Sequence, residues 1–238
     1  IDVWVNNAGV LAAGEFTETP IDILDRVISI NLLGYMHGAH AALPYFKEQG
    51  YGIIINNISV GAWFPTPYAS AYTASKYGLK GFTGSLRGEL RKWPNIHICD
   101  LFPAFLDTPG IQHAANYTGK VLMPAPPVYD PKRVADAMVM LARKPRNKMT
   151  TDSMAPFLKV TYALFPKLTK RITAAAIEKY FETADTQTED SGNLRQPVSW
   201  GTGIYGGWRP KLLRKASTLG VALLGVAAGL LLAKGSFR

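Results

Sequence analysis

Apolar segments of two kinds alternate along residues 1–150. Three short apolar runs predict buried strands, at residues 1–5, 52–58 and 96–102. Three longer segments with helical apolar spacing predict helices: one that opens with Thr19 as N-cap and Pro20 in its first turn, one over residues 70–92 that Pro94 ends, and one over residues 131–141. Strands that alternate with helices are typical of the α/β class, so we expect a doubly wound parallel sheet with helices on both faces.

Three further segments depart from this alternation. Residues 103–130 are rich in proline, glycine and apolar residues and are long for a connection, which favours a lid or a binding loop. Residues 151–182 predict an amphipathic, basic helical extension that Pro166 divides in two. Residues 183–215 are polar and Gly-rich and predict a linker.

The end of the chain contains a long uncharged run. Residues 216–233 carry no charge, and as a helix they would span ~27 Å, just short of the ~30 Å hydrocarbon core of a bilayer. Basic residues are more numerous before this run than after it, which predicts a membrane anchor with the main body on the cytoplasmic side. A buried core helix is the alternative.

The charge is uneven along the chain, whose net charge is +9. Residues 1–119 hold 7 basic and 9 acidic residues, whereas residues 120–238 hold 19 and 8. The basic half indicates an anionic neighbour, a membrane or a nucleic acid, unless it is simply a solvated face. No nucleic-acid-binding motif is present, and the uncharged run favours the membrane. Cys99 is the only cysteine, and His37 and His40 have no acidic or cysteine partner nearby, so we expect no disulfide and no metal site.

Tyr72 and Lys76 are the first candidates for chemistry. They lie four residues apart on a predicted helix and therefore share a face. A lysine ammonium beside a phenol lowers the pKa of the phenol, which would make Tyr72 an acid/base near neutral pH. Ser59 ends the preceding strand at the carboxyl edge of the sheet, where its hydroxyl can hold a carbonyl or alcohol oxygen.

Four motifs follow one another along about residues 1–150. They are Asn-Asn-Ala-Gly at residues 6–9, Asn31 in the following helix, Ser59 with Tyr72 and Lys76, and Pro-Ala-Phe-Leu-Asp-Thr at residues 103–108. In this order they resemble the short-chain dehydrogenase/reductase family. Ala104 stands where the family pattern has glycine. The resemblance implies a Rossmann-type fold, NAD or NADP as cofactor, and hydride transfer between the nicotinamide and a carbonyl/alcohol pair.

The resemblance also implies roles for single residues. Tyr72 would exchange the proton, and Lys76 would lower its pKa and hydrogen-bond the nicotinamide ribose. Ser59 would orient the substrate oxygen, and Asn31 would hold a water that links Lys76 to solvent. The remaining cofactor contacts would come from Asn6, Ala8 and Gly9 on the adenosine side and from Pro103, Leu106 and Thr108 near the nicotinamide.

The family pattern further implies a strand and a Gly-rich phosphate turn upstream of Ile1, and assembly into homodimers or homotetramers. A GxGxxG match at residues 201–206 follows no predicted strand and opens no helix, so we reject it as a nucleotide site.

Aromatic residues between Ser59 and Tyr72 (Trp63, Phe64 and Tyr68) and the apolar loop after residue 103 predict a lipophilic substrate. Two alternatives to a membrane-bound oxidoreductase remain open: a non-catalytic membrane-bound scaffold of the same fold, and a basic nucleic-acid-binding protein.

Overall fold

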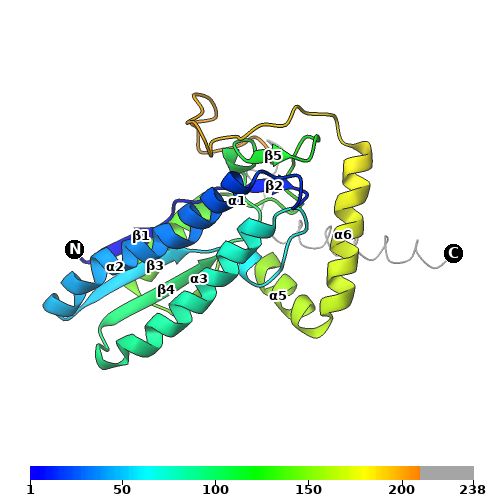
Figure 1. Cartoon of the computed structure of the whole chain (residues 1–238). Coiled ribbons are helices and arrows are strands. Elements are labelled where there is room, and N and C mark those ends of the chain that lie inside the picture. Colours follow the sequence, from blue (N-terminus) through cyan, green and yellow to red (C-terminus); the bar gives the residue numbers. More distant parts are fainter. Residues whose placement is uncertain (210–238) are drawn as a thin grey trace.

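The computed structural model describes residues 1–209 and shows a four-stranded parallel sheet in the order β1-β3-β4-β6 (Figure 1). These strands are β1 (Val3–Asn6), β3 (Gly52–Asn57), β4 (Ile96–Phe102) and β6 (Lys148–Thr150). Two short parallel strands, β2 (Ala12–Gly14) and β5 (Ala115–Tyr117), pair beyond the carboxyl ends of the sheet. The α/β fold and its parallel sheet are therefore as the sequence predicts.

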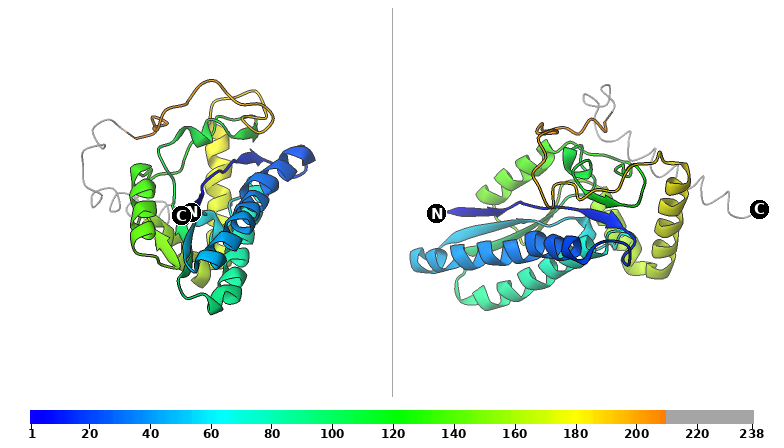
Figure 2. Two further views of the ribbon diagram at one scale, coloured as in Figure 1. Left: turned by 90° about the vertical axis from the view of Figure 1, so that its left-hand side faces the viewer. Right: turned by 45° about the horizontal axis from the view of Figure 1, so that its top comes forward.

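Helices cover both faces of the sheet. The helices α1 (Ile21–Ile28) and α2 (Gly34–Gln49) are joined by a π-helical turn (Ser29–Leu33). Helices α2 and α3 (Ser70–Glu89) pack on one face of the sheet, and α4 (Lys132–Arg143) packs on the other face (Figure 2, left). The core lies between these helices and the strands, where Phe46, Ile54, Ile55 and Leu141 are fully buried.

The ends of the helices correct one detail of the sequence prediction. Thr19 does not cap α1, because its hydroxyl donates to the Glu15 carbonyl at 2.8 Å and Pro20 occupies the N-cap position. The helix over residues 70–92 is confirmed, with its last turn, Leu90–Lys92, in the 3-10 form. At the end of α2 the chain reverses through Gly50, whose φ of 83° suits glycine because it has no Cβ.

Two helices follow the sheet. These are α5 (Met154–Leu164) and α6 (Pro166–Thr183), and Pro166 separates them as expected from its missing N–H. Figure 1 shows α6 standing across the carboxyl ends of the strands. The helical extension that the sequence predicts therefore lies next to the edge of the sheet where ligands bind in α/β folds.

Residues 184–209, which belong to the predicted linker, contact the body of the protein. Leu194 is buried against α1, Arg195 forms an ion pair with Asp22 at 2.9 Å, and the Trp208 backbone N–H donates to Asp107 at 2.8 Å. Polar and glycine-rich sequence can dock in this way because hydrogen bonds, rather than apolar periodicity, hold it to the body.

The predicted anchor at residues 216–233 lies outside the described residues. Within residues 1–209, none of the helices is both long and apolar enough to span a bilayer. The predicted attachment to a membrane thus stays a prediction.

Candidate active site

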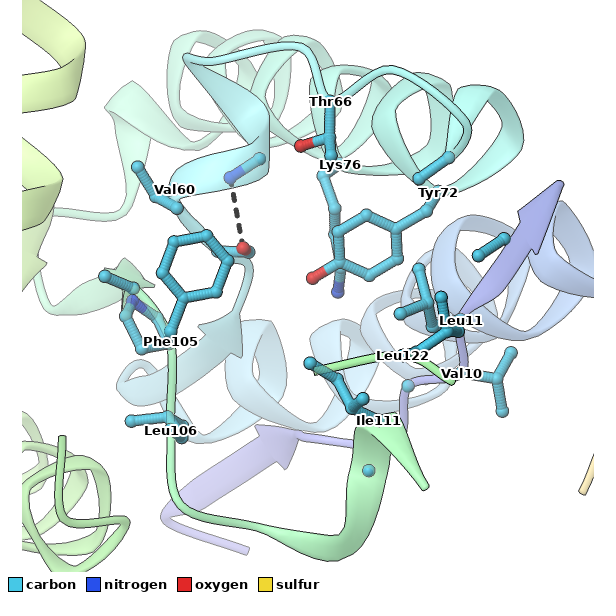
Figure 3. A pocket seen from close by; sticks show the side chains of 18 of the residues that line it. Val10, Leu11, Val60, Thr66, Tyr72, Lys76, Phe105, Leu106, Ile111 and Leu122 are labelled. Carbon is cyan, nitrogen blue, oxygen red and sulfur yellow. Dashed lines mark hydrogen bonds between the residues drawn. The ribbon is translucent and has the colours of Figure 1, made fainter. Parts of the chain in front are cut away.

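A cavity of about 430 Å³ opens at the carboxyl ends of β1, β3 and β4. Its walls come from the loops that follow these strands, the first turns of α3 and the end of α6. Ser59, Tyr72 and Lys76 all line it, and Figure 3 shows the Tyr72 hydroxyl beside the Lys76 amine. The structure therefore brings together the three residues that the sequence singles out for chemistry.

Ser59 has an unusual backbone conformation. Its φ of 142° and ψ of 158° lie in a region that residues with a Cβ rarely adopt. Its Oγ accepts a hydrogen bond from the Gly61 N–H at 3.0 Å, which starts the 3-10 turn Val60–Ala62. A Cβ on Gly61 would lie 3.1 Å from the Tyr72 ring, so this turn packs closely against Tyr72. The hydrogen bond and the close packing of the turn thus hold Ser59 in its strained conformation at the cavity wall.

The strain predicts a difference between two variants that both lack the hydroxyl. We expect Ser59→Gly to be more stable than Ser59→Ala by about 1 kcal/mol, because only glycine accepts a φ of 142° without a steric penalty. Urea unfolding of both variants under identical conditions measures the difference. Equal stabilities, or a more stable alanine variant, would contradict the strain.

Tyr72 lies in the first turn of α3 with its ring partly buried. Burial raises the pKa of Tyr72 above its usual value, and the hydrogen bond with the Ser59 side chain lowers it by a smaller amount. This direction is opposite to the one predicted from the Tyr72 and Lys76 spacing alone. The reason is that desolvation of the phenolate outweighs its favourable interactions in this wall.

Lys76 lies one turn further along α3 and is 3% exposed. Its amine is 3.5 Å from the Asn57 carbonyl and 5.5 Å from the centre of the Tyr72 ring. The ring of Tyr35 lies on another side at 5.3 Å, and the Tyr35 hydroxyl donates to the same Asn57 carbonyl at 2.9 Å. Burial lowers the pKa of Lys76 to about 7, so this amine exchanges protons near neutral pH.

Asn31 is fully buried in the π-helical turn. Its Oδ1 accepts from the Val10 N–H at 2.8 Å, and its Nδ2 donates to the Val10 carbonyl at 2.9 Å and to the Ser75 hydroxyl at 3.3 Å. Asn31 therefore fastens the loop after β1 to α3, next to Lys76. The water that Asn31 is predicted to hold stays a prediction.

The predicted cofactor residues divide into two groups. Gly9, Pro103, Leu106 and Thr108 line the cavity, as do Tyr72 and Lys76. Asn6 and Ala8 are not among the lining residues: Asn6 is buried under the sheet edge and donates to Asn56 at 2.9 Å, and Ala8 is exposed. Successive side chains of a strand point to opposite sides, so Asn7 lines the cavity in place of Asn6 and accepts from Asn57 at 2.8 Å.

Sequence reasoning missed several residues at or around the cavity. Tyr35 lies behind the wall, where its hydroxyl and the Lys76 amine meet the same Asn57 carbonyl, and it follows Asn31 by four positions, so helical spacing could have indicated it. Ile177, Tyr180 and Phe181 of α6 line the cavity itself, and no local pattern connects them to the strand ends. Trp63, expected in the pocket, instead stacks on Phe102 in the core at 4.0 Å between ring centres.

Comparisons with known proteins agree with this geometry. The sequence profile of the family described as short chain dehydrogenase matches residues 1–117. The chain is 33% identical over 176 residues to a Bacillus subtilis protein named "Uncharacterized oxidoreductase YxnA", covering 72% of this chain and 49% of that one. It is 32% identical over 111 residues to the D-beta-hydroxybutyrate dehydrogenase of Rhizobium meliloti, covering 47% of this chain and 43% of the relative.

Solved structures show the same fold. A short chain dehydrogenase from Burkholderia cenocepacia in complex with NADP aligns with a TM-score of 0.62 at 20% identity, covering 73% of this chain and 68% of that chain. A short-chain dehydrogenase from Streptomyces avermitilis aligns with a TM-score of 0.58 at 21% identity, covering 76% and 69%. This chain spans about half the length of the first curated relatives it matches. By its sequence motifs, its sheet and these matches, the chain is similar to short-chain dehydrogenases, and the family profile matches just under half of it.

Proposed function

We propose that this protein is an NAD(P)(H)-dependent oxidoreductase that interconverts a carbonyl and an alcohol on a lipophilic substrate. The observation that carries the proposal is the convergence of Ser59, Tyr72 and Lys76 on one cavity at the carboxyl ends of the sheet. Names of relatives as oxidoreductases and dehydrogenases support the reaction class. No observation favours the non-catalytic scaffold.

Polar groups on the cavity wall could form hydrogen bonds with a nicotinamide nucleotide. Among the described residues, Asn57 Oδ1 and Asn193 Oδ1 are buried without a hydrogen-bond partner, and both residues line the cavity. Buried acceptors without partners indicate a missing donor, such as a ribose hydroxyl. Lys76 and Asn57 would hold the nicotinamide half, Gly9 would line the adenosine side, and the bound nicotinamide supplies or accepts the hydride. The NADP complex of the Burkholderia cenocepacia relative supports this cofactor class.

Tyr72 holds the proton of the reaction. Because burial raises its pKa, the phenol keeps its proton at neutral pH and can donate it to a carbonyl oxygen that the Ser59 hydroxyl orients. Lys76, with a pKa of about 7, lies close enough to return a proton to Tyr72 after each reduction. In the oxidation direction the proton moves the other way: Tyr72 passes its proton to the neutral Lys76 amine and takes the proton of the alcohol.

The apolar wall supports a lipophilic substrate. Around the polar cluster, the cavity is lined mainly by aliphatic and aromatic side chains, including Leu11, Phe64, Phe105, Ile111 and Phe181. Burying one methylene of a substrate contributes roughly 0.8 kcal/mol, which corresponds to about a fourfold gain.

A homologous series of ketones tests this proposal. With NADH or NADPH as reductant, we expect kcat/KM to rise by up to about fourfold for each added methylene until the cavity is filled. The assay follows the consumption of the reduced cofactor by absorbance. A value of kcat/KM that is flat or falls from the shortest ketone onward would contradict the lipophilic substrate, whereas no turnover of any ketone would contradict the reaction class.

Two further features belong to the proposal. Residues 216–233 anchor the protein in a membrane with the catalytic body on the cytoplasmic side, which the uncharged run and its basic flank support. Assembly into a homodimer or homotetramer is supported by the family resemblance.

A further inference from the structure

The outer face of α5 and α6 is apolar and exposed. Six large apolar side chains there are each more than half exposed: Phe157, Val160, Leu164, Phe165, Leu168 and Ile172. On α5 they lie three or four residues apart and on α6 four apart, so each helix presents them on one face, and Phe165 lies in the bend between the two helices. We call these six residues the outer stripe. A contiguous apolar surface of this kind marks an interaction site.

Basic residues accompany the outer stripe. Residues 154–177 contain four basic residues and no acidic one, and Lys167, Lys170 and Arg171 are exposed on α6. The fourth basic residue, Lys159, lies on α5, and its amine is 4.8 Å from the centre of the Trp63 ring. Exposed apolar residues flanked by uncompensated positive charge suit the interface of an anionic bilayer.

The inner face of α6 forms part of the cavity wall. The Tyr180 hydroxyl donates to the Val121 carbonyl at 2.6 Å, and the Phe181 ring meets Tyr68 edge-on at 5.1 Å. Ile172 and Phe181 are nine residues apart, which places them on opposite sides of the helix. Helix α6 therefore carries Leu168 and Ile172 of the outer stripe on one side and lines the cavity with the other.

We propose that the outer stripe inserts into the boundary between headgroups and acyl chains of an anionic bilayer, so that α6 lies between the bilayer and the cavity that it lines. A second copy of this chain fits the face less well, because the basic residues would meet their own copies across a twofold axis. The uncharged run at residues 216–233 also favours a lipid partner. The delivery of a lipophilic substrate from the bilayer to the cavity rests on the proposed function, but the binding of lipid does not.

A fluorescent label at residue 164 tests the insertion directly. Cys99 is the only cysteine and is buried, so the variant Leu164→Cys of the full chain accepts an environment-sensitive nitrobenzoxadiazole label at one site. With vesicles of phosphatidylcholine and phosphatidylserine, we expect a several-fold rise and a blue shift of the emission. The matched control is Glu48→Cys, an exposed position in the last turn of α2, whose label should not respond; α2 and α6 lie at opposite sides of the molecule (Figure 1).

The label at residue 164 distinguishes insertion of the outer stripe from attachment of the protein by another part of the chain. If residues after 209 alone attach the protein to vesicles, the protein floats with them while the label at residue 164 stays unchanged, and the proposal is overturned. A rise that appears without vesicles and grows with protein concentration would indicate a second copy and also overturn it. In the variant Lys167→Glu/Arg171→Glu, we expect the response at residue 164 to need roughly tenfold to a hundredfold more lipid. None of these results depends on turnover of a substrate, so they stand apart from the proposed function.

Discussion

Substitution of Tyr72 by phenylalanine is expected to lower kcat for ketone reduction by about 10²–10⁴-fold, because it removes the group that donates the proton. The ring stays in place among the apolar side chains beside α1, so the fold should be retained. Steady-state kinetics with NADH or NADPH measure the loss, and circular dichroism checks the fold. Tyr45→Phe on α2, whose side chain is largely exposed, is the matched control and should keep full activity.

The Tyr72 variant also separates an enzyme from a scaffold. A correctly folded Tyr72→Phe protein with unchanged turnover would show that the phenol is not the proton donor. Absence of turnover in both the wild type and the variant would favour the non-catalytic alternative.

Substitution of Lys76 by methionine is expected to abolish most of the activity and to raise the stability at the same time. The amine is buried, and its pKa is lowered from 10.5 to about 7. Below pH 7 the lysine is charged in both the folded and the unfolded state, so the folded protein bears the full desolvation penalty. As the pH rises above 7, the folded state releases the proton while the unfolded state keeps it, and the wild type gains stability up to about pH 10.5.

The stability advantage of Lys76→Met should therefore be largest below pH 7 and shrink as the pH rises. Between pH 6 and pH 9 we expect the advantage to fall by roughly 2–3 kcal/mol, at ~1.4 kcal/mol for each pH unit above the folded pKa. Urea unfolding at the two pH values measures this difference. Lys92→Met, at an exposed position, is the control and should show little change. An advantage that does not depend on pH would mean that the amine is not desolvated in the folded protein.

The two variants remove the two groups of the cavity wall that exchange protons, the phenol of Tyr72 and the amine of Lys76. Tyr72 and Lys76 lose solvent in the same wall, so burial moves the pKa of the phenol up and that of the amine down. The buried amine reduces stability and yet lies where a proton must be exchanged. A residue that opposes folding and serves chemistry is typical of a functional site.

Local sequence patterns were sufficient for most of the regular structure. The strand predicted over residues 96–102 is observed with the same ends, and the helix over residues 70–92 is observed as α3 with its 3-10 turn. Apolar periodicity and a terminating proline are local signals, because each depends only on residues that are close together in the sequence. Strands and helices that rest on them can therefore be predicted from the sequence. The strands β2, β5 and β6 have three residues each and show no period, and they form only because distant segments meet.

The composition of the candidate site was predictable where two general rules apply. Carboxyl ends of parallel strands meet at one edge of the sheet, which placed Ser59 there, whereas residues 103–108 were assigned to the site by the family resemblance. Residues four apart share a helix face, which placed Tyr72 beside Lys76. Which of the two asparagines at the end of β1 faces the cavity was not predictable from the sequence. In the structure Asn7 lines the cavity, and Asn6 does not.

The sequence by itself determined the parallel α/β sheet and the meeting of Ser59, Tyr72 and Lys76, because both follow from short-range periodicity and chain direction. Only the tertiary structure decided the direction of the Tyr72 pKa, the backbone partner of Asn31 and the closure of the cavity by α6. Desolvation depends on everything that packs around a group, and α6 reaches the cavity about a hundred residues after Tyr72. Such properties depend on which distant segments come into contact, and no local pattern in the chain records those contacts.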